Sequence, residues 1–438
     1  MVSTAHEPPA APAASFFDRI GIPSNLIWGY AGMLLFMIGD GVETSYLSTY
    51  FKTLYGWSES TVGVIFTTYG IAAAVGAFLA GGLSDRWGAR KVMMIGAAIW
   101  AVCHAIMLAV AVPTGSYALI LGTYGIRGLG YPLFAYGFLV WVMAGAPKQQ
   151  ISKALGWYWF SFTMGYPVLG SGVVSVLKPT IGYYPTLWVS LVLILAGAAI
   201  VFTLLKDRSG YEPLVPADKR PSLVGALVGS VTIMFEKPKV GMGAITRLIN
   251  TTSQFGIWVF VPLYLISEVG YNSEEWSTLL MIMMGSNLAG VVGIGWLGDK
   301  FAGHKVIVWF GGVLCAVTAV SLYYVPAVFG HNYALMAVAC ALYGIGVAGY
   351  VPLPPMMTQH APTRTGQVMA TYTLGAGASQ AVGPAIGTAF IGILGISGVL
   401  WIYAVLHLIS AVLAVVIRKS SATEEEIAAA PADAVVAH

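Results

Sequence analysis

Charged residues are scarce in this chain. Lys and Arg together number 21 and Asp and Glu 18 among 438 residues, so 9% of positions are charged and 58% are hydrophobic. Soluble domains carry about 25% charged residues, and the mean hydropathy of +0.79 is far above soluble values. The composition therefore excludes an ordinary soluble protein and predicts one that crosses a membrane many times.

Cysteine and catalytic motifs are also scarce. Cys103, Cys315 and Cys340 all fall in apolar stretches without metal-ligand spacing, so neither a disulfide framework nor a metal site is expected. The sequence contains no Gly-x-Ser-x-Gly elbow, His-Glu-x-x-His pair or phosphate-binding Gly-x-x-x-x-Gly-Lys-Ser/Thr loop. We therefore expect neither an enzyme nor a cofactor. The net charge of +3 reflects topology and gives no sign of nucleic-acid binding.

Apolar stretches of about 20 residues, the length that crosses a bilayer, follow one another along the chain. The 53 glycines fit closely packed membrane helices better than barrel strands. Twelve spans are expected, at residues 27–50, 60–82, 91–112, 117–141, 152–177, 183–205, 240–266, 275–298, 304–326, 332–357, 366–393 and 398–418. The predicted fold class is an all-α membrane protein.

The positions of Lys and Arg predict the orientation, because basic loops stay in the cytoplasm. With the N-terminus inside, only Lys52 and Lys178 fall on the outer side. We therefore expect a multi-pass protein of the cell membrane with both termini cytoplasmic. The expected order is a tail over 1–26, a six-helix bundle over 27–205, a linker over 206–239, a second bundle over 240–418 and a disordered tail over 419–438. Within the linker, residues 222–235 have the moderate hydrophobicity of an interfacial helix.

A short glycine-and-charge signature occurs twice and aligns without gaps. The copies are Gly81-Gly82-Leu83-Ser84-Asp85-Arg86-Trp87-Gly88-Ala89-Arg90-Lys91 and Gly295-Trp296-Leu297-Gly298-Asp299-Lys300-Phe301-Ala302-Gly303-His304-Lys305. Elsewhere, Tyr124-Gly125-Ile126 matches Tyr343-Gly344-Ile345. The two halves therefore derive from an internal duplication.

Twelve spans in two halves, with this signature after the second span of each, resemble the major facilitator superfamily of transporters. The signature is expected to act as a conformational latch between cytoplasmic helix ends, through Gly81, Asp85, Arg86, Gly88 and Arg90 and, in the second copy, Asp299 and Lys300. The second copy has Ala302 and His304 at the positions of Gly88 and Arg90, so its latch is expected to be weaker. The alternative is that these basic residues only set the topology.

Within the superfamily, the segment Phe36-Met37-Ile38-Gly39-Asp40-Gly41-Val42-Glu43, followed by Tyr46-Leu47-Ser48, resembles the first span of the polyol permease branch. That branch takes up pentitols such as ribitol and arabinitol. Some of its bacterial homologues are labelled dicarboxylate permeases, so the resemblance leaves two substrate classes open.

Charges inside the spans mark the expected chemistry, because a charge at mid-membrane costs several kcal/mol unless it is paired or hydrated. Asp40 and Glu43 are three residues apart on one helix face, and Arg127 lies at comparable depth in the fourth span. First and fourth spans line the central cavity in the superfamily. We therefore expect Arg127 to pair with Asp40 or Glu43, and the acids to couple transport to a proton. The alternative is a static ion pair between two helices.

The second half has neutral residues at the matching positions, with Gln254 opposite Asp40 and Gly346 opposite Arg127. Amides donate and accept hydrogen bonds, as a polyol requires, and aromatic faces suit its C–H surface. The expected substrate-binding residues are Asn250, Gln254, Asn287, Tyr46, Tyr131, Trp157 and Tyr350. Arg247 lies two turns cytoplasmic of Gln254, and it would favour an anion if it reached the cavity. From the sequence we assign no function to His104, Gln380 and His407.

The sequence thus predicts a secondary transporter that takes up a small polyol, such as a pentitol, with a proton. A Gly-Pro motif typical of antiporters is imperfect on span five, where the chain has Gly165-Tyr166-Pro167, which favours symport and leaves facilitated diffusion open. The alternative substrate is a carboxylate. The expected partners are the small-molecule substrate, the proton and the lipid bilayer, and the expected state is a monomer.

Overall fold

The structure is a computed structural model that describes residues 15–147, 151–213, 222–421 and 423. Within these ranges the chain is mainly helical and contains no strand. The N-terminal half contains α1 Phe16–Ile20, α2 Ile27–Val42, α3 Leu47–Tyr55, α4 Glu59–Trp87, α5 Ala89–Ile106, α6 Val112–Thr114, α7 Tyr117–Arg127, α8 Gly130–Gly145, α9 Ile151–Thr163, α10 Gly170–Ile181 and α11 Tyr183–Leu204. The linker contains α12 Leu223–Glu236. The C-terminal half contains α13 Pro238–Tyr264, α14 Ser273–Lys300, α15 Gly303–Val306, α16 Cys315–Phe329, α17 Tyr333–Ala348, α18 Leu353–Thr358 and α19 Thr365–Val416.

Short stretches of other helix types join several of these elements. The π-helical stretches are η2 Met107–Ala111, η4 Met164–Leu169, η7 Leu265–Val269 and η8 Ile307–Leu314. The 3₁₀ turns are η1 Ser24–Leu26, η5 Arg208–Gly210 and η9 Pro362–Arg364. Most of the tail residues 1–26 and 419–438, and part of the linker, lie outside the described residues.

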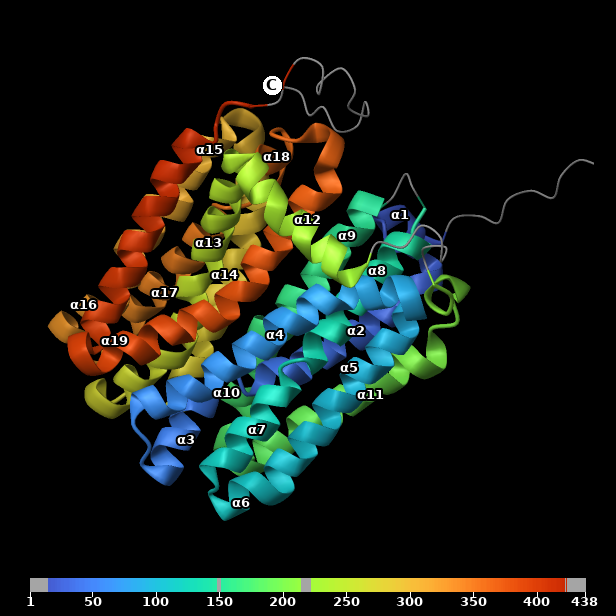
Figure 1. Cartoon of the computed structure of the whole chain (residues 1–438). Helices are drawn as coiled ribbons and strands as arrows, with labels where there is room; N and C mark the ends of the chain where they lie inside the picture. The colour runs from blue at the N-terminus through green and yellow to red at the C-terminus, as the bar shows by residue number, and fades with distance from the viewer. Residues whose placement is uncertain (1–14, 148–150, 214–221, 422, 424–438) are drawn as a thin grey trace, which may run out of the picture.

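Ten helical stretches of the described chain are long and apolar enough to cross a membrane. The 28-residue helix α14 is also long enough. The 52 residues of α19 are too many for one crossing, and its backbone leaves the helical region at Gly395 (φ 64°, ψ −178°), so α19 forms two legs (Figure 1). The predicted all-α membrane fold with twelve spans is confirmed.

The helices form two groups (Figure 1), and each group has an apolar core of its own. One core gathers residues between Leu26 and Leu205, and the other gathers mainly residues between Ile257 and Tyr403. The elements α1, α12, α15 and α18 lie at one end of the molecule, here called the termini end, and α3 and α6 lie at the opposite, far end. The two halves meet chiefly where α4 runs along α19.

Small residues line this contact between α4 and α19. A Cβ on Gly70 would lie 2.2 Å from the backbone oxygen of Gln380, and a Cβ on Gly377 would lie 3.4 Å from the Cα of Ala74. Only glycine permits the approach at Gly70. The two halves therefore touch nearly backbone to backbone.

Two spans of the N-terminal half are interrupted near their centres, although the sequence predicted continuous helices over 27–50 and 117–141. The first breaks between Val42 and Leu47, and the second breaks between Arg127 and Gly130. At the second break, Pro132 has no N–H to donate to the carbonyl four residues earlier. Glu43 and Arg127 lie at these two breaks.

Candidate functional site

A buried ion pair joins the two breaks. Arg127 Nη1 donates to Glu43 Oε2 at 2.7 Å, and Nη2 donates to Oε1. The guanidinium also lies 4.4 Å from the Tyr124 ring centroid and 4.6 Å from that of Trp100. Because both Arg127 and Glu43 are buried, this bidentate pairing compensates the arginine charge within the hydrocarbon region.

His104 holds the same guanidinium from the other side. Its Nδ1 lies 2.6 Å from Arg127 Nη1, and its Nε2 lies 3.2 Å from the carbonyl oxygen of Leu187. Arginine can only donate, so Nδ1 accepts and Nε2 carries the hydrogen that Leu187 accepts. We therefore assign a neutral imidazole that positions Arg127. The sequence did not predict this role, although Trp100 and His104 are four residues apart on α5 and share a face.

Asp40 is not part of the ion pair. Its side chain is buried, and Oδ1 accepts a hydrogen bond of 2.6 Å from Trp100 Nε1. Its other oxygen, Oδ2, has no hydrogen-bond partner among the described residues. An ionised carboxylate with an unpaired buried oxygen is costly, whereas a protonated one carries no charge. The direct ion-pair partner of Arg127 is therefore Glu43, whereas Asp40 makes no ion pair within the described part of the chain and interacts with the Arg127 charge only at longer range.

A central cavity lies between the halves, next to this charged cluster. Its volume is about 40 Å³ in this conformation, small beside the roughly 300–1,000 Å³ of an open small-molecule pocket, so the cavity is narrow here. It is lined by Thr44, Phe66, Tyr69, Tyr124, Tyr166, Phe255, Trp258, Val259, Gln380 and Pro384. Tyr69 and Tyr124 also face the Arg127 guanidinium, at 5.4 and 4.4 Å from their ring centroids. One layer of aromatic rings thus separates the cavity from the buried charges.

Among the predicted substrate-binding residues, Tyr131 reaches this region, since its hydroxyl accepts a hydrogen bond from the amide of the cavity residue Gln380. The Oδ1 atom of Asn250 is buried without a partner among the described residues. The amide of Gln254 lies 3.5 Å from the sulfur of Met284. Neither Asn250 nor Gln254 is among the described residues that line the cavity.

The other predicted substrate-binding residues make hydrogen bonds within their own halves. Asn287 donates to the carbonyl of Gly344 at 3.1 Å, and the Tyr46 hydroxyl donates to that of Tyr183 at 3.2 Å. Trp157 donates to the carbonyl of Ile20 at 2.9 Å, near the termini end. Tyr350 donates to the carbonyl of Gly311 at 2.8 Å and contacts His407 and Ser410. Asn287, Tyr46, Trp157 and Tyr350 do not line the central cavity.

The cavity residues that sequence reasoning missed are mainly aromatic. Trp258 lies one helical turn beyond Gln254 on α13, so the predicted amide already marked its face. Phe66, Tyr69, Tyr166 and Phe255 carried no such signal, because an aromatic residue in a membrane span packs equally well in a core or against lipid.

The first signature copy connects helix ends of the N-terminal half. Arg90 donates to the carbonyls of Phe202 at 2.6 Å and Leu205 at 3.3 Å, and its guanidinium lies 4.5 Å from the Tyr211 ring. Gly88 has a φ of 84°, and a Cβ there would lie 2.9 Å from the Tyr211 backbone oxygen, so glycine is required. The basic residue therefore caps the carbonyl end of α11.

The remaining latch residues show no comparable contact. Gly81 has open space around it, and Arg86 is exposed. The side chains of Asp85, Asp299 and Lys300 lie outside the described residues, although the backbone of α14 extends to Lys300.

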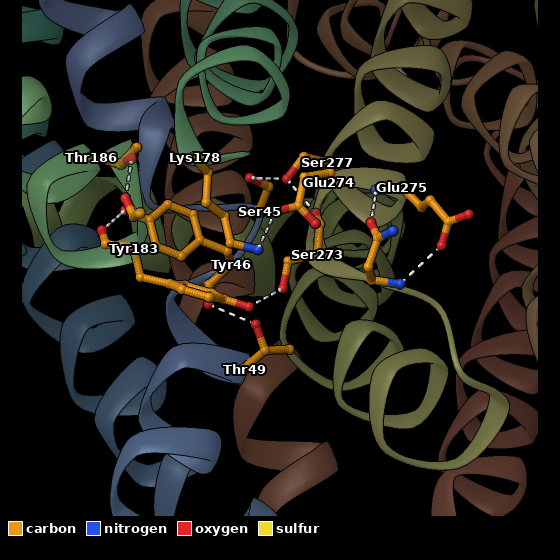
Figure 2. A network of polar contacts seen from close by, with 12 residues as sticks. Ser45, Tyr46, Thr49, Lys178, Tyr183, Thr186, Ser273, Glu274, Glu275 and Ser277 are labelled. Atoms are coloured by element: carbon orange, nitrogen blue, oxygen red, sulfur yellow. Dashed lines mark hydrogen bonds and ion pairs between the residues drawn. The ribbon is translucent and has the colours of Figure 1, made fainter. Parts of the chain in front are cut away.

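Polar contacts join the two halves at the far end (Figure 2). Lys178 Nζ lies 3.0 Å from Glu274 Oε1, and the Tyr183 hydroxyl lies 3.0 Å from Ser273 Oγ. Ser277 Oγ donates to Ser45 Oγ at 2.9 Å. These three contacts are called the far-end network below. Through this network the two halves are held together at the far end, so the structure is closed at that end.

No group of three or more His, Cys, Asp or Glu side chains within the described part of the chain is arranged to hold a metal ion. The site described above consists of a buried acid, a compensated ion pair and an aromatic cavity shared between two bundles.

Two bundles of membrane-spanning helices around a shared central cavity define a membrane transporter. The family model described as Major Facilitator Superfamily matches residues 29–364 and 243–436, and the chain belongs to that superfamily. This confirms the resemblance noted in the sequence.

Curated relatives cover almost the whole chain. It is 40% identical over 397 residues to the alpha-ketoglutarate permease of Bacillus subtilis (strain 168), with 90% of each chain covered. It is 34% identical over 399 residues to the D-arabinitol transporter of Klebsiella pneumoniae, covering 91% of this chain and 93% of the relative. The crystal structure of the nucleoside transporter NupG shares the fold, with a TM-score of 0.71 at 16% identity, over 90% of this chain and all of that one.

Proposed function

We propose that this transporter takes up a small polyol, such as a pentitol, together with a proton, by alternating access. The observation that supports this best is Asp40, a buried acid that makes no ion pair with any described residue. It lies near the Glu43–Arg127 pair, which one layer of aromatic rings separates from the central cavity. In this proposal the protein acts as a monomer in the cell membrane with both termini cytoplasmic, so the far end faces outward.

The proposed coupling step is protonation of Asp40 at Oδ2. Trp100 already occupies Oδ1, so the proton binds the other oxygen and neutralises a buried acid that makes no ion pair among the described residues. Glu43 keeps Arg127 compensated in both protonation states, and His104 keeps it in place. Loading of the cavity and of Asp40 together then favours the rearrangement that opens one end and closes the other. The signature residues, including Asp85, Arg86, Asp299 and Lys300, are proposed to stabilise one of these conformations.

The D-arabinitol transporter among the relatives supports a polyol as the substrate. The cavity agrees with it, because aromatic faces suit the C–H surface of a polyol and a neutral amide suits its hydroxyls. Asn250 and Gln254 lie on the same helix as the cavity residue Trp258, and we propose that they extend the binding surface toward the termini end.

A small carboxylate is the second candidate substrate. It is favoured by Arg247, whose guanidinium lies 4.8 Å from the Tyr372 ring centroid and has no acidic partner among the described residues. It is also favoured by the 40% identity to the alpha-ketoglutarate permease. An unpaired guanidinium binds a carboxylate with two parallel hydrogen bonds.

The test is uptake into proteoliposomes that contain the purified protein. Accumulation of radiolabelled D-arabinitol driven by an inward proton gradient, and abolished by a protonophore, is the expected result. Accumulation of alpha-ketoglutarate alone would transfer the assignment to the second candidate. Equilibration of the solute without accumulation would overturn proton coupling.

A further inference from the structure

The wall of the central cavity is aromatic and uncharged. Six of its lining residues are aromatic, namely Phe66, Tyr69, Tyr124, Tyr166, Phe255 and Trp258, and the polar side chains beside them include those of Thr44 and Gln380. None of the described residues that line it is charged. The cavity therefore selects by shape and hydrogen bonding.

Trp258 adds to this wall a hydrogen-bond donor that has no acceptor among the described residues. Its side chain is 4% exposed, and its Nε1 atom is buried without an acceptor among the described residues. The indole is packed beside Phe255 and Tyr166, at centroid distances of 5.3 and 5.9 Å. A buried N–H without a partner is unfavourable, so an oxygen atom of a bound ligand would stabilise this site.

Gln380 contributes an acceptor from another helix. Its amide nitrogen donates to Tyr131, which fixes the orientation of the group. Its Oε1 atom makes no hydrogen bond to any part of the chain that the structure describes. The cavity thus has a donor on α13 and an acceptor on α19, and a hydroxyl group both accepts and donates.

The cation beside the cavity is not available to bind a ligand there. Arg127 is already compensated by Glu43 and lies behind Tyr69 and Tyr124. A carboxylate in this cavity would lose its hydration without gaining a cation. A neutral ligand avoids that cost, and its C–H groups pack against the rings.

We infer that Trp258 and Gln380 determine specificity, recognising adjacent hydroxyl groups of a neutral polyhydroxylated ligand from two helices. This inference rests on the proposed polyol uptake and names the residues that select the substrate. Because the pair is separate from Asp40, it acts on substrate affinity and leaves the proton step alone.

The experiment uses the variants Trp258→Phe and Gln380→Met, which keep the volume and remove the polar group. Trp309→Phe is the matched control, since Trp309 is 65% exposed on the outside of the protein. Binding of D-arabinitol is measured by calorimetry in detergent, thermal unfolding verifies folding, and gradient-driven uptake reports the proton step. Each variant is expected to bind roughly tenfold more weakly, as for the loss of one hydrogen bond to a buried group. Its uptake at saturating substrate should still depend on the proton gradient.

The outcomes separate the two proposals. If the wild-type protein binds D-arabinitol and both folded variants bind it equally well, the assignment of Trp258 and Gln380 is overturned and the proposed uptake stands. If the wild-type protein binds succinate and no polyol, the proposed polyol uptake fails and this inference fails with it. Weaker binding in both variants, with unchanged binding in Trp309→Phe, supports the pair.

Discussion

Lys178 on α10 and Glu274 on α14 join the two halves across the far end, with Nζ 3.0 Å from Oε1 (Figure 2). The Lys178 side chain is 2% exposed and its Nζ lies 3.8 Å from the Tyr183 ring centroid, whereas the Glu274 side chain is 29% exposed. An ion pair with one partly exposed partner contributes about 1 kcal/mol, the upper end of the range for pairs that water reaches. The bridge therefore biases the equilibrium between conformations without locking it.

Removing this bridge should favour the conformation that is open at the far end. Lys178→Met is expected to raise its population about fivefold, which corresponds to about 1 kcal/mol. Distances between spin labels placed across the far end report the population. Glu275→Gln is the matched control, because Glu275 bonds Asn272 and His331 within its own half. Unchanged distances in Lys178→Met would show that the bridge is not part of the gate.

Asp40→Asn should uncouple substrate transport from the proton gradient. The amide still accepts the hydrogen bond from Trp100 but cannot release a proton, so exchange of labelled for unlabelled substrate should continue. Accumulation driven by a proton gradient should be lost. Both are measured in proteoliposomes, and Glu59→Gln, which alters an acid paired with Lys52 near the far end, serves as the control. Full accumulation by Asp40→Asn would exclude Asp40 as the proton carrier.

Glu43→Gln should mainly affect stability. It leaves Arg127 buried without a counter-charge, which costs about 3–5 kcal/mol. The double variant Glu43→Gln with Arg127→Met removes both charges and should recover much of this loss. Thermal unfolding in detergent compares the three proteins. A single variant as stable as the wild type would mean that water or another group compensates Arg127.

Arg247→Gln tests the second candidate substrate. If the chain carries a carboxylate, loss of the guanidinium should weaken its binding at least tenfold, because a charge-assisted pair is lost. If it carries a polyol in the aromatic cavity, the affinity for D-arabinitol should change less than twofold. Calorimetry with each ligand distinguishes the two results.

Asp207 should make stability depend on pH at the termini end. Burial opposes ionisation of its carboxyl group, but hydrogen bonds from Ser209, Asn25 and Trp141 outweigh it and lower its pKa below the usual 3.8. The stabilisation is therefore complete above the unfolded-state pKa and disappears as the pH falls through the lower folded-state pKa. Asp207→Asn should reduce thermal stability at pH 7, and its difference from the wild type should shrink in acid. A pH-independent difference would contradict this.

Hydropathy and spacing were sufficient to predict the twelve spans and the buried charges, because both follow from composition along one helix. They left the partner of Arg127 open, since Asp40 and Glu43 share a face when the helix is continuous. The break after Val42 displaces Glu43 from that regular helix, and the breaks depend on packing between spans. Periodicity in one sequence does not report such packing.

The cavity was harder to predict than the charges. From the sequence alone, an aromatic residue such as Tyr166 can equally pack in a core, face lipid or contact a ligand. Only the packing of α4, α13 and α19 against one another shows which of these applies. Tyr350 and Trp157 were predicted to bind the substrate, but their polar groups donate hydrogen bonds to nearby carbonyls instead.

The small residues between α4 and α19 have a kinetic consequence. Because Gly70 and Gly377 present backbone rather than side chains to the opposite half, no side chain has to be withdrawn at these two positions when the halves rotate. The activation barrier for alternation then depends mainly on the polar contacts between the halves, namely the far-end network and the hydrogen bonds of Gln380 to Tyr131 and of Ser60 to Thr388.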